Sequence, residues 1–327
     1  MGTDLHLSNA LLDFLGKFQG RPMSISDIEY YYGDQGWEEA LGMPVSEAFS
    51  LFRHENLVLA ADPATDPFRL ANLLLSVAKL KALLKPQGAK ISGKKEDLIN
   101  RLLELNPDIL AAALPNQLFF IPTEAGNALI EARIGARRAK RDQCESRILD
   151  YLVQGMTVDA IHTWNQYAEG EPFKLRIEGS RFDREVNILN TIKYSACSYL
   201  RSRLAPEEVD ALRAFAAITH LCGKNLSEAS LEKLRPDIES FKQRGHDLPM
   251  ETAARMLTFF AIGQENLRNF KKMGYAFAST TSCSESCEFC KAQSGIRHQV
   301  EQIRELPHQE CTHPSGCRCT YLMHTKG

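Results

Sequence analysis

Residues 76–104 read SVAKLKALLKPQGAKISGKKEDLINRLLE and predict two short amphipathic helices joined by a glycine-containing loop. Apolar side chains recur at the i, i+3, i+4 spacing of a core-facing helix surface in both halves: Leu80, Leu83, Leu84, Leu98, Ile99, Leu102 and Leu103. Gly88 is placed to end the first helix at positive φ, and Ser92 is placed to cap the second. The segment therefore predicts a compact helical hairpin.

This hairpin is basic, although the chain as a whole is nearly neutral. Seven cations oppose three anions, which gives a local charge of about +4 (7 − 3), whereas the net charge of the chain is −2. A helix N-terminus beside two adjacent lysines, Lys94 and Lys95, makes a site for a phosphate-sized anion. The alternative is a solvated helical hairpin that carries ordinary surface lysines.

The segment resembles the SAP motif, a helix–extended–helix element that binds DNA. The resemblance rests on a Leu-Lys-x-x-Leu helix, a glycine, Ser-Gly-Lys-Lys and a Leu-x-x-x-Leu helix, in that order. It implies that Lys94 and Lys95 contact DNA phosphates, while Lys90, Ser92 and Gly93 shape the approach to the backbone. DNA is the partner that this resemblance implies.

Length and composition set broad limits on the class of protein. A chain of 327 residues suits two or three domains, and 24% charged with 44% hydrophobic residues are ordinary globular values. The near-neutral charge argues against a general polyanion binder. There is no apolar run near 18 residues and no basic-then-apolar start, so we expect a cytoplasmic protein without a membrane partner.

Residues 1–134 contain the parts expected of a winged helix, which forms the N-terminal part of a mainly α fold. The expected elements are helices that begin at Ser8, Ser26 and Pro44, strands at 57–59 and 118–122, and a helix capped by Thr123. The hairpin, at about 76–105, is then inserted in the wing or follows it. An unclassified helical domain with a small hairpin is the alternative.

Residues 135–278 predict a helical domain that could serve for association with a protein partner. Residues 172–177 alternate polar and apolar side chains and predict a short strand. The run from Arg133 to Arg141 holds five cations and no anion. It could extend a DNA footprint, but we favour a solvated linker.

The nine cysteines are unevenly distributed, and six of them lie within residues 283–319. Cys144, Cys197 and Cys222 stand singly in helical sequence and are expected to be buried and reduced. In a chain without a secretory signal, the crowded cysteines indicate a metal site before a disulfide framework.

The tail at 279–327 predicts a structural zinc knuckle. Cys287 and Cys290 have the Cys-x-x-Cys spacing that lets two thiolates approach one tetrahedral zinc. Two of the three later cysteines, Cys311, Cys317 and Cys319, should complete the site. His308 and His313 are reserve ligands, and Cys283 is the least favoured cysteine.

The tail also resembles the cysteine-rich ending of phage head-morphogenesis proteins and related bacterial proteins. In that ending, Cys-x-x-Cys, a glycine and His-Pro-x-Cys-Arg-Cys follow in the same order. Here Ser-Gly replaces the single residue between Pro314 and Cys317, which weakens the case for His313 as a ligand. The resemblance implies a metal knuckle and a bacterial or phage context.

No catalytic motif emerges from the sequence. Gly88–Lys95 is one residue short of a P-loop, and His308-Gln-Glu310 lacks the downstream Pro-Cys-x-x-Cys of zinc deaminases. We therefore expect a non-catalytic DNA-binding protein of bacterial, phage or mobile-element origin. The alternatives are a protein–protein adaptor or phage assembly factor, and a zinc-supported nuclease.

Overall fold

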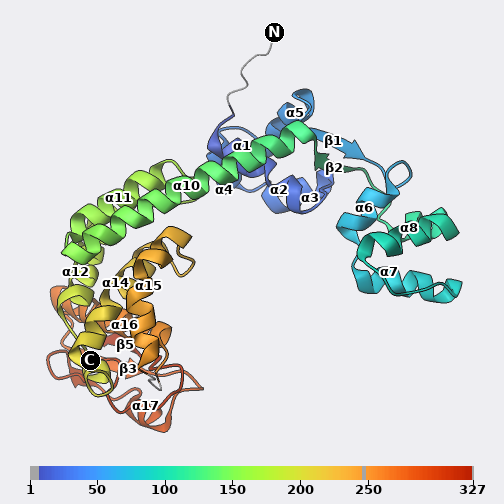
Figure 1. Cartoon of the computed structure of the whole chain (residues 1–327). Helices are drawn as coiled ribbons and strands as arrows, with labels where there is room; N and C mark the ends of the chain where they lie inside the picture. The colour runs from blue at the N-terminus through green and yellow to red at the C-terminus, as the bar shows by residue number, and fades with distance from the viewer. Residues whose placement is uncertain (1–6, 245–247, 326–327) are drawn as a thin grey trace. The chain divides into compact units, whose positions relative to one another are not determined.

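The computed structural model describes residues 7–244 and 248–325, and the chain is mainly helical, as predicted (Figure 1). It divides into two compact units. Unit 1 comprises the described residues up to Arg137 together with Gly170–Phe173, and unit 2 comprises Arg138–Glu169 and the described residues from Lys174 onward. The three boundaries expected from the sequence, at 1–134, 135–278 and 279–327, stay predictions.

Unit 1 consists of short helices, one pair of strands and the first part of a long helix. In chain order these are α1 (Asn9–Leu15), α2 (Lys17–Gly20), α3 (Ile25–Tyr32), α4 (Gln35–Leu41), α5 (Val45–His54), β1 (Val58–Ala61), α6 (Pro67–Leu74), α7 (Val77–Leu84), the 3-10 turn η1 (Lys85–Gln87), α8 (Lys95–Leu105), α9 (Pro107–Ala113), β2 (Phe119–Pro122) and α10 (Glu124–Gln154).

Helix starts in unit 1 follow the caps that the sequence supplies. The Ser8 hydroxyl accepts a hydrogen bond from the Leu11 N–H at 3.2 Å, so α1 begins as predicted. The predicted start at Ser26 is wrong, because Ser24 is the N-cap of α3. The Ser24 hydroxyl accepts the Asp27 N–H, and the Asp27 carboxylate accepts the Ser24 N–H, which completes a capping box.

The antiparallel pair β1–β2 separates two hydrophobic cores of unit 1. Alternate residues of a strand point to opposite faces. Val58 and Phe120 therefore join the core of α1–α5, which includes Phe14, whereas Phe119 and Ile121 join the core of α6–α9. One short ribbon thus supports both halves of the unit.

In this half of the chain a third segment joins the β1–β2 pair, and the winged-helix assignment stays a prediction. Met23, before α3, forms an antiparallel bridge with Phe120 of β2, and β1 follows α5 directly. The α7–α8 hairpin lies in the chain between β1 and β2, where a wing loop would connect the two strands. The insertion of the hairpin between two paired strands was predicted.

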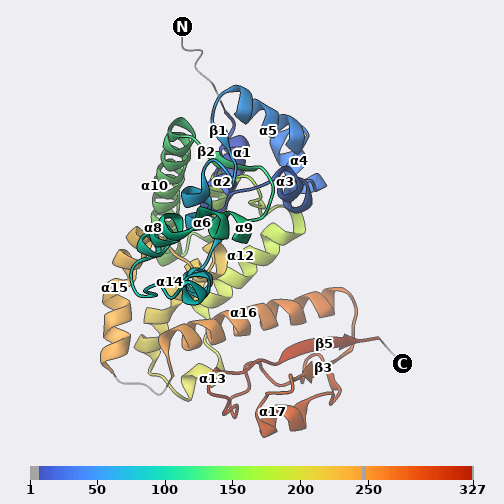
Figure 2. The same ribbon diagram turned by 90° about the vertical axis from the view of Figure 1, so that its right-hand side faces the viewer.

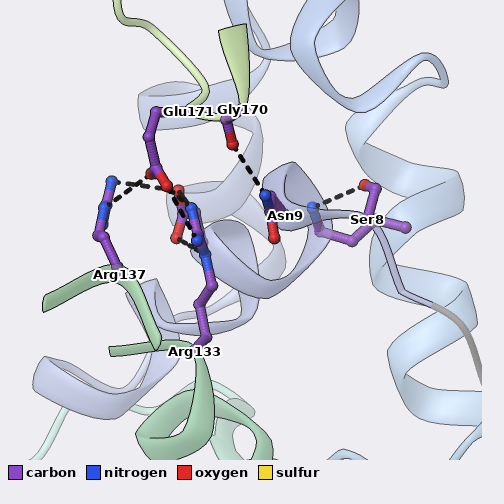
Figure 3. A network of polar contacts seen from close by, with 8 residues as sticks. Ser8, Asn9, Arg133, Arg137, Gly170 and Glu171 are labelled. Carbon is purple, nitrogen blue, oxygen red and sulfur yellow. Dashed lines mark hydrogen bonds and ion pairs between the residues drawn. The ribbon is translucent and has the colours of Figure 1, made fainter. Parts of the chain in front are cut away.

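The basic run from Arg133 to Arg141 is not a linker, contrary to the prediction, because it lies inside α10. Figure 3 shows the Arg133 and Arg137 side chains converging on Glu171. Arg133 Nη2 lies 2.7 Å from Glu171 Oε2, and its Nε lies 3.0 Å from Asp13 Oδ1. Arg137 contacts the same two carboxylates. The charges of Arg133 and Arg137 are therefore engaged in long-range ion pairs within unit 1.

Unit 2 contains the rest of α10, further helices and a small sheet. In chain order the further elements are α11 (Thr157–Glu169), α12 (Gly179–Tyr194), α13 (Ser198–Arg201), α14 (Pro206–Cys222), α15 (Glu228–Gln243), α16 (Met250–Lys272), β3 (Phe277–Thr281), α17 (Glu288–Gln293), β4 (His298–Gln299) and β5 (Thr320–His324).

Helices α12, α14 and α16 pack on one another, and α16 also packs on β5 of the β4-β3-β5 sheet (Figure 2). At that contact Gly263 gives the Tyr321 ring room, because a Cβ there would lie 3.1 Å from the ring, closer than ordinary van der Waals contact. Leu257 of α16 shares one buried core with Cys290 and Cys311 of the tail. Across the residues that the structure describes, every helix is too short or too polar to cross a lipid bilayer.

The predicted strand at residues 172–177 is wrong, because no strand forms there. Instead, the side-chain amide of Asn165 pairs with the backbone of Ile177. It accepts the Ile177 N–H at 2.7 Å and donates to the Ile177 carbonyl at 2.9 Å. A buried side chain thus satisfies the backbone groups that a neighbouring strand would otherwise pair.

Candidate nucleic-acid interface and metal centre

The α7–α8 hairpin has the two leucine-rich faces that the sequence predicts. Leu80 and Leu84 of α7 and Leu98 and Leu102 of α8 are buried in the core that the two helices share. Gly88 has a φ of +64° and ends the turn after α7, as expected for a residue without a Cβ. The hydrophobic contacts hold the intervening loop on the surface.

The start of α8 differs from the prediction, because Lys94 and not Ser92 is the N-cap residue. The Asp97 carboxylate accepts the Lys94 N–H at 2.9 Å, so an acid within the helix supplies the capping interaction. Gly93 has a φ of +134°, and a Cβ there would lie 3.0 Å from Asp97 Oδ2. Glycine is therefore required at this turn.

Lys94 and Lys95 occupy different environments, which the sequence alone does not distinguish. Lys94 is exposed, whereas Lys95 is half-buried and its ammonium donates a hydrogen bond to the Asn72 carbonyl of α6 at 2.5 Å. Lys95 thus ties α8 to α6. Lys94 keeps its charge directed to solvent beside the first turn of α8.

Arg101 holds the loop in shape, a role that the sequence reasoning missed. Its guanidinium donates to the Ser92 carbonyl at 3.3 Å and also to the Lys90 carbonyl. No local pattern links Arg101 to residues 9 and 11 positions earlier, so only its charge was apparent from the sequence. By binding two carbonyls, Arg101 keeps the backbone of the loop in one conformation.

The hairpin carries a set of exposed lysines. None of them forms an ion pair within residues 7–244 and 248–325, and they come from α7, the turn after it, the loop and the cap of α8. They are Lys79, Lys81, Lys85, Lys90 and Lys94. Unpaired cations on one small domain can bind a polyanion without first breaking internal ion pairs.

The contrast between the two adjacent lysines predicts a difference in stability. Replacing Lys95 by Met removes the hydrogen bond to Asn72, so we expect the free energy of unfolding of unit 1 to fall by about 1 kcal/mol. The same substitution at Lys94 should change it by less than about 0.5 kcal/mol. Urea denaturation of the two variants measures both values. Equal effects would contradict a structural role for Lys95.

The candidate metal centre brings together all five favoured cysteines of the tail. Their sulfur atoms form two groups of mutually close thiols that share Cys290, the first with Cys287 and Cys311 and the second with Cys317 and Cys319. Within each group the sulfur atoms lie within 4.8 Å of one another. All except Cys287 are buried. Metal binding by these thiols stays a prediction.

Two elements position these thiols. Cys287 is the N-cap of α17, and Cys290 lies within its first turn, which places both side chains at one end of the helix. The other three thiols, those of Cys311, Cys317 and Cys319, lie in the loop that precedes β5. The sulfur atoms of Cys287 and Cys311 lie 3.8 Å apart, and those of Cys290 and Cys317 lie 3.9 Å apart.

The environment prepares the Cys287 thiol to lose its proton. Partial burial opposes ionisation, but hydrogen bonds from the backbone N–H groups of Cys290 and Thr312 lower the pKa of Cys287 to about 6. Burial raises the pKa of Cys290. A hydrogen bond with Cys317, together with burial, raises the pKa of Cys311. A metal cation bound between these thiols would take the place of the protons that the neighbouring sulfur atoms share.

The reserve ligands of the tail lie outside both groups of thiols in the described chain. His308 is buried, its ring lies edge-on to Phe289, and its Nε2 atom has no hydrogen-bond partner among the described residues. His313 Nδ1 accepts the Ser315 N–H at 3.1 Å. The Cys283 thiol lies 3.3 Å from the Ser286 hydroxyl.

The donor set suits a thiophilic cation. Thiolates are preferred by zinc, whereas magnesium and calcium prefer oxygen ligands. Four thiolates around one zinc leave no open position, and such closed sites are structural. The clustered cysteines of the tail can therefore hold a metal ion, and their chemistry fits zinc.

Comparison with known proteins identifies one family in this chain. Neither a search of curated proteins nor a search of solved structures finds a match. The family model described as SAP domain matches residues 74–106, which span α7, the loop and α8. The hairpin inserted between β1 and β2 is thus a SAP domain, as its leucine, glycine and lysine pattern predicted.

Proposed function

We propose that this protein binds duplex DNA through its SAP domain without catalysing a reaction. The observation that carries the proposal is the group of exposed lysines, unpaired in the described chain, on the domain that matches the SAP family. Lys94 contacts a phosphate at the start of α8, and Lys95 adds a second charge beside it. Lys90, Ser92 and Gly93 shape the approach of the backbone, supported by Arg101.

The tail and its thiols support a proposed origin, metal ion and cellular location for the protein. We propose a protein of bacterial, phage or mobile-element origin, which rests on the resemblance of the tail to phage head-morphogenesis proteins. The thiol cluster holds one structural zinc ion, and free thiols persist in the reducing cytoplasm, where we place the protein. Unit 2 provides a surface for a protein partner.

The DNA proposal predicts a loss of affinity when the charge of Lys94 is reversed. Lys94→Glu should weaken binding to a short labelled duplex by roughly tenfold, for any base sequence, because phosphate contacts carry no sequence information. The slope of log affinity against log salt should become shallower by about 1. Fluorescence anisotropy across a salt series measures both quantities.

A matched control is Lys224→Glu, which makes the same charge change at an exposed lysine of unit 2. It should leave both affinity and salt slope close to the wild-type values. If Lys94→Glu behaves like the control, the hairpin is not the contact surface. A wild-type protein without duplex binding would favour the adaptor function, and cleavage of a plasmid with magnesium or manganese would favour the nuclease.

A further inference from the structure

We infer that one zinc ion is held by four of the five clustered thiols, those of Cys287, Cys290, Cys311 and Cys317. The fifth thiol, Cys319, is a buried neighbour that does not bind the ion. This assignment rests on the proposed structural zinc and adds to it the identity of the ligands.

The first argument is the geometry of two separate thiol pairs. Cys287 and Cys311 lie 3.8 Å apart at sulfur, and Cys290 and Cys317 lie 3.9 Å apart. Zinc–sulfur bonds of about 2.3 Å in a tetrahedron place the sulfurs about 3.8 Å from one another. Since the two pairs share no atom, they correspond to two opposite edges of such a tetrahedron and together account for four ligands.

The second argument is the set of contacts that joins these two pairs. Cys290 belongs to one close group with Cys287 and Cys311. Cys317 joins that group through its 3.9 Å contact with Cys290. Cys319 lies within 4.8 Å of Cys290 and Cys317, but it takes part in neither of the two closer thiol contacts. Cys317 is therefore better placed than Cys319 to be the fourth ligand.

The assignment also agrees with the coordination preference of the ion. Structural zinc sites take four ligands, so a cluster of five thiols leaves one of them out. Each half of the tail then contributes two ligands: Cys287 and Cys290 from the start of α17, and Cys311 and Cys317 from the loop before β5. Zinc would link these two segments.

Two serine variants test the assignment. Cys317→Ser should lower the affinity for zinc by more than about 100-fold, whereas Cys319→Ser should lower it by less than about tenfold, because removing a supporting neighbour costs less than removing a ligand. Competition with a chromophoric chelator measures affinity, and elemental analysis should give one zinc per chain for wild type and for Cys319→Ser.

A cobalt-loaded protein keeps the test informative if Cys317→Ser does not fold. Thiolate-to-cobalt charge-transfer absorption should be the same in Cys319→Ser and wild type, and weaker in the ligand-conserving variant Cys317→His. A lower absorption in Cys319→Ser, equal affinities of the two serine variants, or two zinc ions per chain would overturn the assignment. A wild-type chain that binds no zinc would instead refute the proposed metal itself.

Discussion

Removal of the proposed structural zinc by a chelator should lower the thermal unfolding temperature of unit 2 by more than about 10 °C. Structural zinc contributes many kcal/mol to folding, and about 2–4 °C is lost per kcal/mol in a unit of this size. Cys290, Cys311 and Cys317 lie in the same buried core as Leu257 of α16 and Leu212 of α14. The loss should therefore extend from the tail into the helices.

Differential scanning calorimetry of the purified full chain, with and without chelator, measures this change. The control is the same chelator saturated with zinc beforehand, which should leave the transition in place. Zinc added back to the metal-free protein should restore it. A metal-free protein that unfolds at the unchanged temperature would show that the thiol cluster stabilises the fold without a metal.

Arg133→Ala should cost unit 1 about 3–5 kcal/mol of its free energy of unfolding, because it removes the buried cation that pairs with two buried carboxylates. The side chains of Arg133, Asp13 and Glu171 are 7%, 9% and 0% exposed. Burial disfavours the charged guanidinium, but hydrogen bonds to Glu171 and Asp13 raise the pKa of Arg133 overall. Arg137 is 41% exposed and compensates the two carboxylates only in part.

The matched control is Arg138→Ala, an exposed position on the same helix, which should change stability by less than about 0.5 kcal/mol. The chain has two tryptophans, Trp37 in unit 1 and Trp164 in unit 2, so both variants are made with Trp164→Phe. Urea denaturation followed by the fluorescence of Trp37 then reports on unit 1. Equal costs at Arg133 and Arg138 would rule out a stabilising role for the network.

Features that depend on neighbouring residues were predictable from the sequence. The leucine spacing and Gly88 defined the hairpin because helix faces and turn conformations are set within a few residues. The Cys-x-x-Cys spacing placed Cys287 and Cys290 together for the same reason. Ser92 was a wrong choice of cap, because Asp97 competes for the same role from inside the helix.

Features that depend on distant partners were not predictable. The basic run resembled a linker because Asp13 and Glu171 lie 120 and 38 residues from Arg133 in the chain. Lys95 and Lys94 are equivalent in the sequence pattern, but only the Lys95 ammonium lies beside the carbonyl of Asn72, 23 residues earlier. Such partners become neighbours only through packing.

The sequence by itself determined the SAP domain, the mainly helical fold and the concentration of thiols in the tail, because periodicity, turn residues and cysteine spacing are local properties. Tertiary structure alone decided which charges remain available to DNA and which are used internally. It also decided which cysteine sulfurs meet at metal-binding distances. Both outcomes depend on the desolvation and approach of groups far apart in the chain, which no local pattern encodes.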